Sequence, residues 1–181
     1  MFLKKEDILV RSAVIEDAPI LTAWWNDGNV MAHAGFPKGL GITEEEVKAQ
    51  INLNHNHLSQ RCMIEVKRQK IGECNFRLKE NAAEIGIKIC DVSYQNKGLG
   101  TTILKMLINY LFTDNSLNKS MKVKKIILDT NQKNLRAQHV YETLGFKKVS
   151  TNINAWKDQL GIWQTSIDYE LTIDDFNRQN N

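Results

Sequence analysis

The chain has 181 residues, of which 42% are hydrophobic and 25% are charged, and its formal net charge at pH 7 is +3. That size and composition are typical of one soluble globular domain, so we expect residues 1–181 to form a single domain. The small positive charge is too weak to indicate nucleic acid as a partner, and none is expected, although the charge suits a polyanionic small ligand.

Neither a membrane segment nor a secretory signal is visible in the sequence. No apolar run approaches the roughly 20 residues that a spanning helix needs. The N-terminus, MFLKKEDILVRS, has no apolar core of the kind that a signal peptide carries. We therefore expect a cytoplasmic protein with no membrane partner.

The cysteines and histidines do not indicate a metal site. Cys62, Cys74 and Cys90 are widely spaced, lie in strand-like segments and form no C-x-x-C pair, so buried free thiols are expected. His55 and His57 are two residues apart rather than four, so they cannot share one helical face as metal ligands do. We expect no metal.

Hydrophobic periodicity and turn residues predict a series of helices and strands. In chain order these are a strand over 8–14, a helix over 16–27, a glycine-rich loop over 28–41, a helix from Thr43, strands over 61–67, 70–78 and 83–91, a helix over 98–112, a strand over 125–130, a helix over 134–144, and strands over 146–150 and 163–171. The tail DDFNRQNN is expected to fray. The order predicts an α/β (α+β) fold with a mixed central sheet of six to seven strands and about four helices.

The second helix has the clearest predicted start. Thr43 and Glu46 form a T-x-x-E capping box, which marks a helix N-terminus. Val47, Ile51 and Leu58 would then continue one apolar face along the helix.

The most informative stretch is DVSYQNKGLGTT, residues 91–102, in which a strand ends and a helix begins. A helix N-terminus offers free backbone N–H groups and the positive end of the helix dipole. Gly98 and Gly100 would let a phosphate approach that backbone, and Lys97 adds a positive charge. The alternative is an ordinary glycine-containing turn, because G-x-G alone is a weak signal and no P-loop is present.

Two segments together resemble the signatures of the GNAT superfamily of N-acyltransferases. Q-x-x-G-x-G at Gln95–Gly100 is similar to the acetyl-CoA signature of that family. N-x-x-A-x-x-x-Y-E-x-L-G-F at Asn134–Phe146 is similar to its second motif. The resemblance covers about residues 8–171. It implies a sheet splayed between the strands near 83–91 and 125–130, and an acetyl-CoA-dependent N-acetyltransferase of the branches that act on protein N-termini, polyamines or other small amines.

The resemblance also implies a binding site for acetyl-CoA. Backbone groups of Lys88, Ile89 and Cys90 would pair with the pantetheine arm and the thioester, and Asn134 would touch the cofactor from the other side. The implied pyrophosphate ligands are the backbone N–H groups of Gln95, Asn96, Lys97, Gly98, Leu99, Gly100 and Thr101.

Acyl transfer to an amine needs a group that accepts the ammonium proton and is helped by one that protonates the leaving thiolate. Glu84 is the preferred base, because the resemblance implies this role: family members with A-E-I at the same position use its glutamate as the base. Glu73 and a chain of water molecules are the alternatives. Each carboxylate could also be an ordinary solvated strand residue. Tyr141, whose phenol has an ordinary pKa of about 10, is the expected acid for the thiolate. The alternative is a tyrosine that packs in the core.

The acceptor amine is not readable from the sequence, and neither is a choice between monomer and homodimer. His33, in the loop over 28–41, could contact the acceptor, because loops often carry function. Aromatic residues could line the same site, although core packing is expected for most of them; they are Trp24, Trp25, Phe36, Trp156 and Trp163. A non-catalytic acyl-CoA-binding module is the competing class of protein. The presence of both Glu84 and Tyr141 favours the enzyme.

Overall fold

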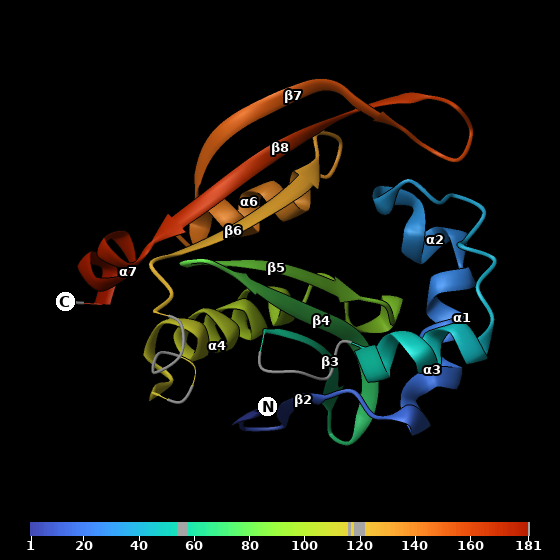
Figure 1. Cartoon of the computed structure of the whole chain (residues 1–181), viewed down its shortest axis with the longest axis horizontal. Coiled ribbons are helices and arrows are strands. Elements are labelled where there is room, and N and C mark those ends of the chain that lie inside the picture. Colours follow the sequence, from blue (N-terminus) through green and yellow to red (C-terminus); the bar gives the residue numbers. More distant parts are fainter. Residues whose placement is uncertain (54–57, 116, 118–121, 181) are drawn as a thin grey trace. The chain divides into compact units, whose positions relative to one another are not determined.

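The structure is a computed structural model that describes residues 1–53, 58–115, 117 and 122–180. The chain divides into two units (Figure 1). The first unit contains Met1–Ala13, Leu53–Ile127 and Leu171–Asn181, and the second contains Val14–Asn52 and Leu128–Glu170. The histidines His55 and His57 lie outside the described residues.

The first unit is built on a largely antiparallel sheet. Its strands, hydrogen-bonded in this order, are β1 (Phe2–Lys5), β2 (Ile8–Ser12), β3 (Ser59–Val66), β4 (Gln69–Lys79), β5 (Ala82–Ile89) and β6 (Lys125–Asn131). β5 and β6 are parallel, and their pairing joins Ala82–Glu84 to Lys125–Ile127. That pairing involves only the first part of β5, as the expected splay requires.

The strands β3, β4 and β5 present two chemically different faces. On one face Phe76 and Ile85 are buried, and the Phe76 ring lies 6.2 Å from the Tyr110 ring on α4 (Leu99–Thr113). Arg77 and Glu84 follow them in alternation and therefore occupy the opposite face. The predicted apolar face is thus the face that packs against α4, and the polar face carries the charged side chains.

The helix α7 (Ile173–Asn180) closes the first unit, and the expectation that the tail frays is wrong. Thr172 and Asp175 form a cap in which the Asp175 N–H donates to the Thr172 hydroxyl at 3.1 Å. The Phe176 ring lies 5.0 Å from the Phe112 ring of α4. A polar tail becomes helical here because one aromatic residue docks on the core.

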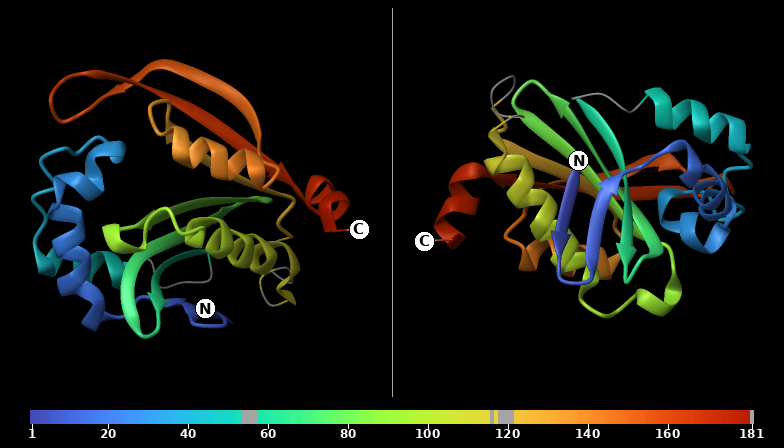
Figure 2. Two further views of the ribbon diagram at one scale, coloured as in Figure 1. Left: turned by 180° about the vertical axis from the view of Figure 1, so that it is seen from behind. Right: turned by 90° about the horizontal axis from the view of Figure 1, so that it is seen from below.

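The second unit combines helices with the remaining strands. In chain order its elements are η1 (Ile15–Asp17), α1 (Ala18–Asn26), α2 (Gly28–Met31), η2 (Ala32–Ala34), α3 (Glu44–Leu53), the rest of β6, α6 (Leu135–Thr143), β7 (Lys147–Lys157) and β8 (Trp163–Thr172). β8 lies between β6 and β7 in the sheet order. α6 lies beside β8 (Figure 2), and the Tyr141 ring meets the Tyr169 ring edge-on at 5.6 Å.

Most predicted elements are confirmed within a few residues. The described chain has eight strands and six α-helices; the additions to the prediction are β1, α2 and α7. The predicted capping box is present, with the Thr43 N–H donating to the Glu46 carboxylate at 2.8 Å. The assignment of Leu58 to that helix is wrong, because Leu58 leads into β3 and its carbonyl accepts from the Leu78 N–H at 2.6 Å.

All three cysteines are buried and free, as predicted. Across the described ranges, no helix combines the length and the apolar character needed to cross a membrane.

Candidate active site

The joint between β5 and α4 is a compact, internally bonded turn in the first unit. β5 ends at Ile89, and the turn contains the short helix η3 (Val92–Tyr94). The Asp91 carboxylate accepts from the Ser93 N–H at 2.9 Å, and the Gln95 amide donates to the Ile89 carbonyl at 2.9 Å. The Gln95 side chain therefore ties the start of the helix to the end of the strand.

The N-terminus of α4 is open at both glycines. Gly98 is the N-cap with φ +73°, a left-handed conformation that favours glycine. A Cβ added at Gly98 or Gly100 would meet nothing within 4 Å. The Thr102 N–H donates to the Gly98 carbonyl at 3.2 Å, so the N–H groups of Leu99, Gly100 and Thr101 have no partner inside the helix.

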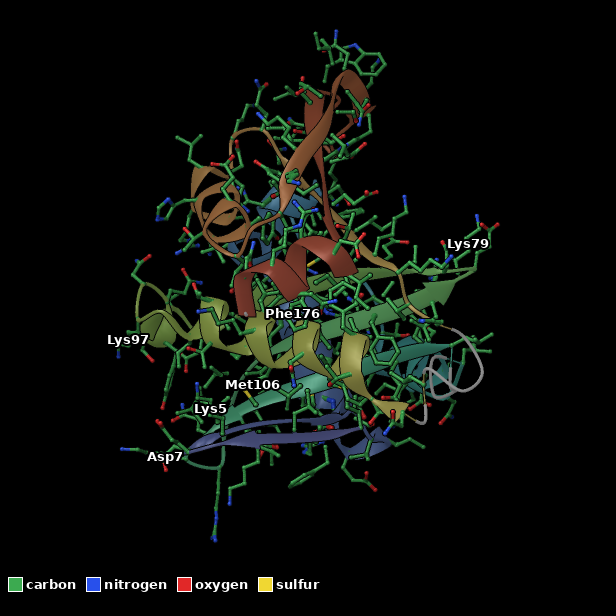
Figure 3. The ribbon with its side chains drawn as sticks, turned by 90° about the vertical axis from the view of Figure 1, so that its left-hand side faces the viewer. Lys5, Asp7, Lys79, Lys97, Met106 and Phe176 are labelled. Carbon is green, nitrogen blue, oxygen red and sulfur yellow. The ribbon has the colours of Figure 1, made fainter. Side chains whose placement is uncertain are left out.

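The side chain of Lys97 adds a cation at this end of the helix. Its Nζ lies 5.4 Å from the centroid of the Tyr94 ring, and the side chain points outward (Figure 3). The dipole end, the open glycines and the lysine together form a place where an anionic group can lie against the backbone.

Of the three residues at the end of β5 that were predicted to pair with the pantetheine arm, one directs its backbone N–H to the free edge of the strand. The Cys90 N–H donates to the Ile71 carbonyl at 2.9 Å, and Lys88 lies opposite Glu73. Hydrogen-bonded and non-hydrogen-bonded pairs alternate along antiparallel strands, so Lys88 and Cys90 direct their backbone groups toward β4. Ile89 directs its N–H away from β4, where a ligand can reach it.

Glu84 lies on the polar face of β5, at the edge of a pocket of about 220 Å³ formed entirely within the first unit. Its side chain is exposed, and it lies directly opposite Arg77 on β4. The residues that line this pocket are Ser59, Gln60, Arg61, Asn75, Phe76, Arg77 and Glu84. About 17 Å of strand, at 3.4 Å per residue, separates Glu84 from Ile89.

Glu73, the alternative candidate for the base, contacts two cationic side chains. It is 1% exposed, forms an ion pair with Arg61 and lies 3.4 Å from the Lys88 ammonium. Each of its carboxylate oxygens therefore has a cationic partner. A buried carboxylate held in this way stabilises the sheet and is poorly placed to exchange protons with a substrate.

We predict that Glu73→Gln lowers the free energy of unfolding by about 3–5 kcal/mol, because Arg61 and Lys88 would lose their carboxylate. Urea denaturation measures the loss. The control is Glu80→Gln, which removes an exposed carboxylate from the β4–β5 turn and should change stability by less than about 0.5 kcal/mol. Equal stability of the two variants would contradict the structural role of Glu73.

The other predicted residues, Tyr141 and Asn134, lie in the second unit. Tyr141 is 8% exposed and packs against Tyr169 and Phe146, whose ring centroids lie 5.6 Å and 6.0 Å from its own. The pKa of Tyr141 is raised to about 12. Burial is the largest cause, and the nearby Asp129 carboxylate and Tyr169 contribute less. The Asn134 side-chain Oδ1 caps α6 by accepting from the Ala137 N–H at 3.2 Å.

The loop over 28–41 is held in place by Gln159, which follows β7. The Gln159 backbone N–H donates to the Gly35 carbonyl at 2.8 Å, and the Gln159 side-chain amide donates to the Gly39 carbonyl at 2.9 Å. The expectation of a loop over 28–41 is wrong for its first part, which forms α2 and η2; His33 is exposed in η2. The sequence offered no signal for Gln159, because the contact joins segments more than one hundred residues apart.

The aromatic residues of this unit divide by burial. Trp25 packs in the core at 3% exposed, as expected. Trp156 lies against Gly35, where a Cβ would approach its ring to 2.2 Å. Trp163 and Phe36 are exposed, and Trp24 and Trp156 are partly exposed, so the expectation of core packing for most of these residues is wrong.

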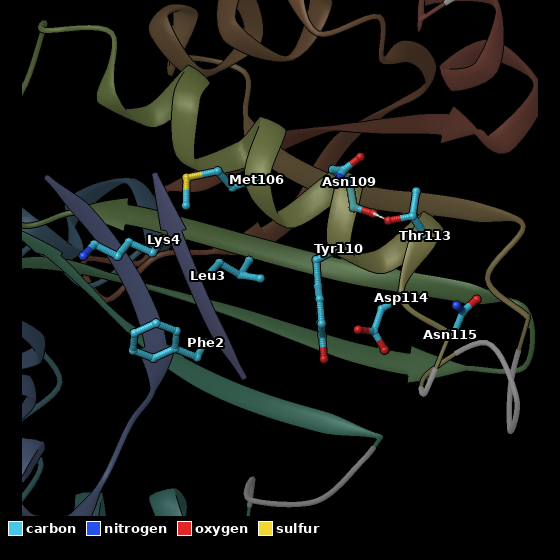
Figure 4. A pocket seen from close by; sticks show the side chains of 9 residues that line it. All are labelled: Phe2, Leu3, Lys4, Met106, Asn109, Tyr110, Thr113, Asp114 and Asn115. Atoms are coloured by element: carbon cyan, nitrogen blue, oxygen red, sulfur yellow. Dashed lines mark hydrogen bonds between the residues drawn. The ribbon is translucent and has the colours of Figure 1, made fainter. Parts of the chain in front are cut away.

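A larger hollow of about 580 Å³ lies elsewhere in the first unit, between β1 and α4. Leu3, Met106 and Tyr110 project into it (Figure 4). It contains none of the predicted site residues. The larger volume of this hollow therefore does not make it the candidate active site.

The mixed sheet with a parallel β5–β6 pair, the glycine turn and the open helix N-terminus agree with the fold that the sequence motifs predicted. The chain belongs to the acetyltransferase (GNAT) domain family, whose profile matches residues 7–147. It is an acyltransferase of that family, as the sequence motifs predicted.

Individual relatives agree with this assignment. The chain is 28% identical over 124 residues to the uncharacterized N-acetyltransferase p20 of Bacillus licheniformis, covering 65% of this chain and 69% of that protein. A spermidine N-acetyltransferase from Vibrio cholerae, solved with CoA and spermine, has 20% identity and a TM-score of 0.81 over 96% of this chain and 99% of that one. RimL, a ribosomal L7/L12 alpha-N-protein acetyltransferase solved with CoA, has 17% identity and a TM-score of 0.81 over 97% and 99%.

Proposed function

We propose that residues 1–181 act as one N-acetyltransferase domain that moves an acetyl group from acetyl-CoA to a primary amine by direct attack in a ternary complex. The observation that carries this proposal is the open N-terminus of α4, with Gly98 and Gly100 unobstructed next to the free edge of β5. We further propose that the protein acts in the cytoplasm, as a monomer or homodimer and without a metal.

In this proposal the pyrophosphate of CoA lies against the N–H groups of Leu99, Gly100 and Thr101, with Lys97 as counter-ion. Of the other predicted ligands in the turn, the Gln95 N–H donates instead to the Val92 carbonyl at 3.1 Å, and the N–H groups of Asn96 and Gly98 remain proposed ligands. The pantetheine arm runs along β5, where the Ile89 N–H faces it and those of Lys88 and Cys90 face β4. The distance along β5 from Ile89 to Glu84 is long enough to accommodate the pantetheine arm, which ends in the thioester.

In the proposed reaction the amine nitrogen attacks the thioester carbonyl, a C–N bond forms, and the C–S bond breaks. Glu84 accepts the proton that the amine loses. The thiolate of CoA leaves and is stabilised by the Tyr141 hydroxyl. A full proton transfer from a phenol of pKa about 12 to a thiolate of ordinary pKa near 8.5 would be uphill by about 5 kcal/mol. We therefore assign Tyr141 a hydrogen bond to the sulfur, rather than the complete protonation expected from the sequence.

The first experiment measures thermal stability with acetyl-CoA and with CoA. A ligand at 100 times its dissociation constant adds about 2.7 kcal/mol of stability, so the melting temperature should rise clearly. Release of free thiol in the presence of mixed amines then tests transfer. The polyamine and protein N-terminus named for the two structural relatives are the first acceptors to include. Binding without transfer to any amine would instead support the non-catalytic module.

We predict that Gly100→Val weakens CoA binding by about 10–100-fold, because a side chain at this position would displace the phosphate from two or more backbone donors. Folding should be nearly unaffected, since a Cβ at Gly100 meets nothing within 4 Å and the site is open. Gly98 is a poorer test, because its φ of +73° makes any side chain strained. Isothermal titration with CoA measures the affinity.

The matched control is Asn109→Val, which places the same residue at an exposed position of the same helix. This variant should bind CoA like the parent protein. Normal CoA affinity in Gly100→Val would mean that the pyrophosphate is held elsewhere.

A further inference from the structure

We propose that the acceptor is a zwitterion, a small molecule that carries a carboxylate close to its reactive amine, as an amino acid does. This inference rests on the proposed function and assigns the substrate class of the same site. Its basis is the juxtaposition of Arg77 and Glu84 in the 220 Å³ pocket of the first unit.

Arg77 and Glu84 carry opposite charges on neighbouring strands. They are directly opposite each other on β4 and β5, and both line the pocket. Directly opposed residues have Cβ atoms about 5 Å apart. Yet within the described ranges neither side chain forms an ion pair or a hydrogen bond, with the other or with any neighbour. The pocket therefore presents a cation and an anion side by side, each available to a ligand.

The remaining charges near the pocket are balanced. Arg61 is paired with Glu73, the same carboxylate that also lies 3.4 Å from Lys88. The other lining side chains, apart from the Phe76 ring, are neutral and polar: Ser59, Gln60 and Asn75. Arg77 is thus the cation of the lining that lacks a carboxylate partner among the described residues.

This arrangement selects among amines. An arginine binds a carboxylate in a forked, bidentate geometry, and such charged hydrogen bonds are the stronger ones. Glu84 would meet the ammonium group and accept its proton. A polyamine presents several ammonium groups and would need several carboxylates, whereas Glu84 is the single carboxylate of the lining. The volume of about 220 Å³ lies below the 300–1,000 Å³ typical of drug-sized ligands, which favours a small acceptor.

The test compares matched acceptors. Common L-amino acids are each assayed against their own carboxamides, with spermidine and pentylamine included, by release of free thiol from acetyl-CoA. For at least one amino acid, kcat/KM should exceed that of its carboxamide by about 10–100-fold, the value of one charged hydrogen-bonded contact. The difference should lie mainly in KM.

Arg77→Gln should remove most of this preference, and Arg77→Lys should restore part of it. The control is Lys79→Gln, which removes an exposed lysine at the end of the same strand, two residues beyond Arg77 and outside the pocket (Figure 3). This control should keep the full preference. A preference for carboxamides, pentylamine or spermidine in the parent protein would overturn the proposal, and so would an unchanged preference in Arg77→Gln.

A binding measurement separates this proposal from the proposed function. Calorimetry of the CoA-loaded protein with the same amino acids and carboxamides needs no turnover. Tighter binding of an amino acid, lost in Arg77→Gln, supports the zwitterion site even if no amine is acetylated. Equal binding of the two series overturns it, even if acetyl transfer to other amines is observed.

Discussion

Glu84→Gln is expected to lower the rate of acetyl transfer at pH 7 by about 10²–10⁴-fold, the usual contribution of a general base. The amide keeps the shape of the side chain and its place opposite Arg77, but it cannot accept the proton. The loss should shrink as the pH approaches the acceptor's own pKa, because free amine is then already present. A pH–rate profile of both proteins between pH 6 and pH 10 measures this.

Glu80→Gln is the control for Glu84→Gln, since it removes a carboxylate from the same β-hairpin outside the pocket. Its rate should match that of the parent protein at every pH. A loss in Glu84→Gln that is constant across the pH range would assign Glu84 to positioning the amine. An unchanged rate would transfer the role of base to water, since Glu73 is bound to Arg61 and Lys88.

Tyr141→Phe removes one oxygen and keeps the ring, and it should lower the rate by about 10–1,000-fold. The variant loses one hydrogen bond to the leaving thiolate; loss of a single donor to a developing anion usually costs about 10²–10³-fold, and less where the thiolate can leave without help. Acetyl-CoA binding should change little, since the ring contacts with Tyr169 and Phe146 remain. The loss should be smaller with an acyl donor whose thiol is more acidic. Single-turnover rates and donor affinity separate these effects.

The same variant has an expected effect on alkaline stability. The pKa of Tyr141 is raised from 10 to about 12 in the folded protein, so the folded state holds the phenol proton more tightly than the unfolded state. That contribution is complete below pH 10 and is lost as the pH rises toward 12. Tyr141→Phe should therefore decline less in stability over that interval.

A purely structural role for Tyr141 predicts the opposite combination. Among the described residues the Tyr141 hydroxyl has no hydrogen-bond partner, so this role predicts little change in stability and full turnover per folded molecule. Melting temperature, donor affinity and rate, measured on this one variant, therefore decide between the two roles. A stable protein with full turnover would end the assignment.

Local signals in the sequence were sufficient for most of the fold. The capping box at Thr43 and Glu46 acts over three residues, and the structure contains its hydrogen bonds. The Q-x-x-G-x-G joint was recognisable because a glycine N-cap and an open first turn are properties of adjacent residues. Where a signal depended on distant contacts the prediction failed, as at α7, which is held by the packing of Phe176 on Phe112.

By itself, the sequence determined the family, the order of the main elements and the place of the glycine turn before α4, because periodicity, caps and glycine conformation are short-range properties. Only the tertiary structure decided which charged groups surround each carboxylate. The register of β3, β4 and β5 places Glu73 between Arg61 and Lys88 and leaves Glu84 opposite Arg77. Register is set by strand pairing across the sheet, where a shift of one residue exchanges the two faces, and no local pattern specifies which charges then become neighbours.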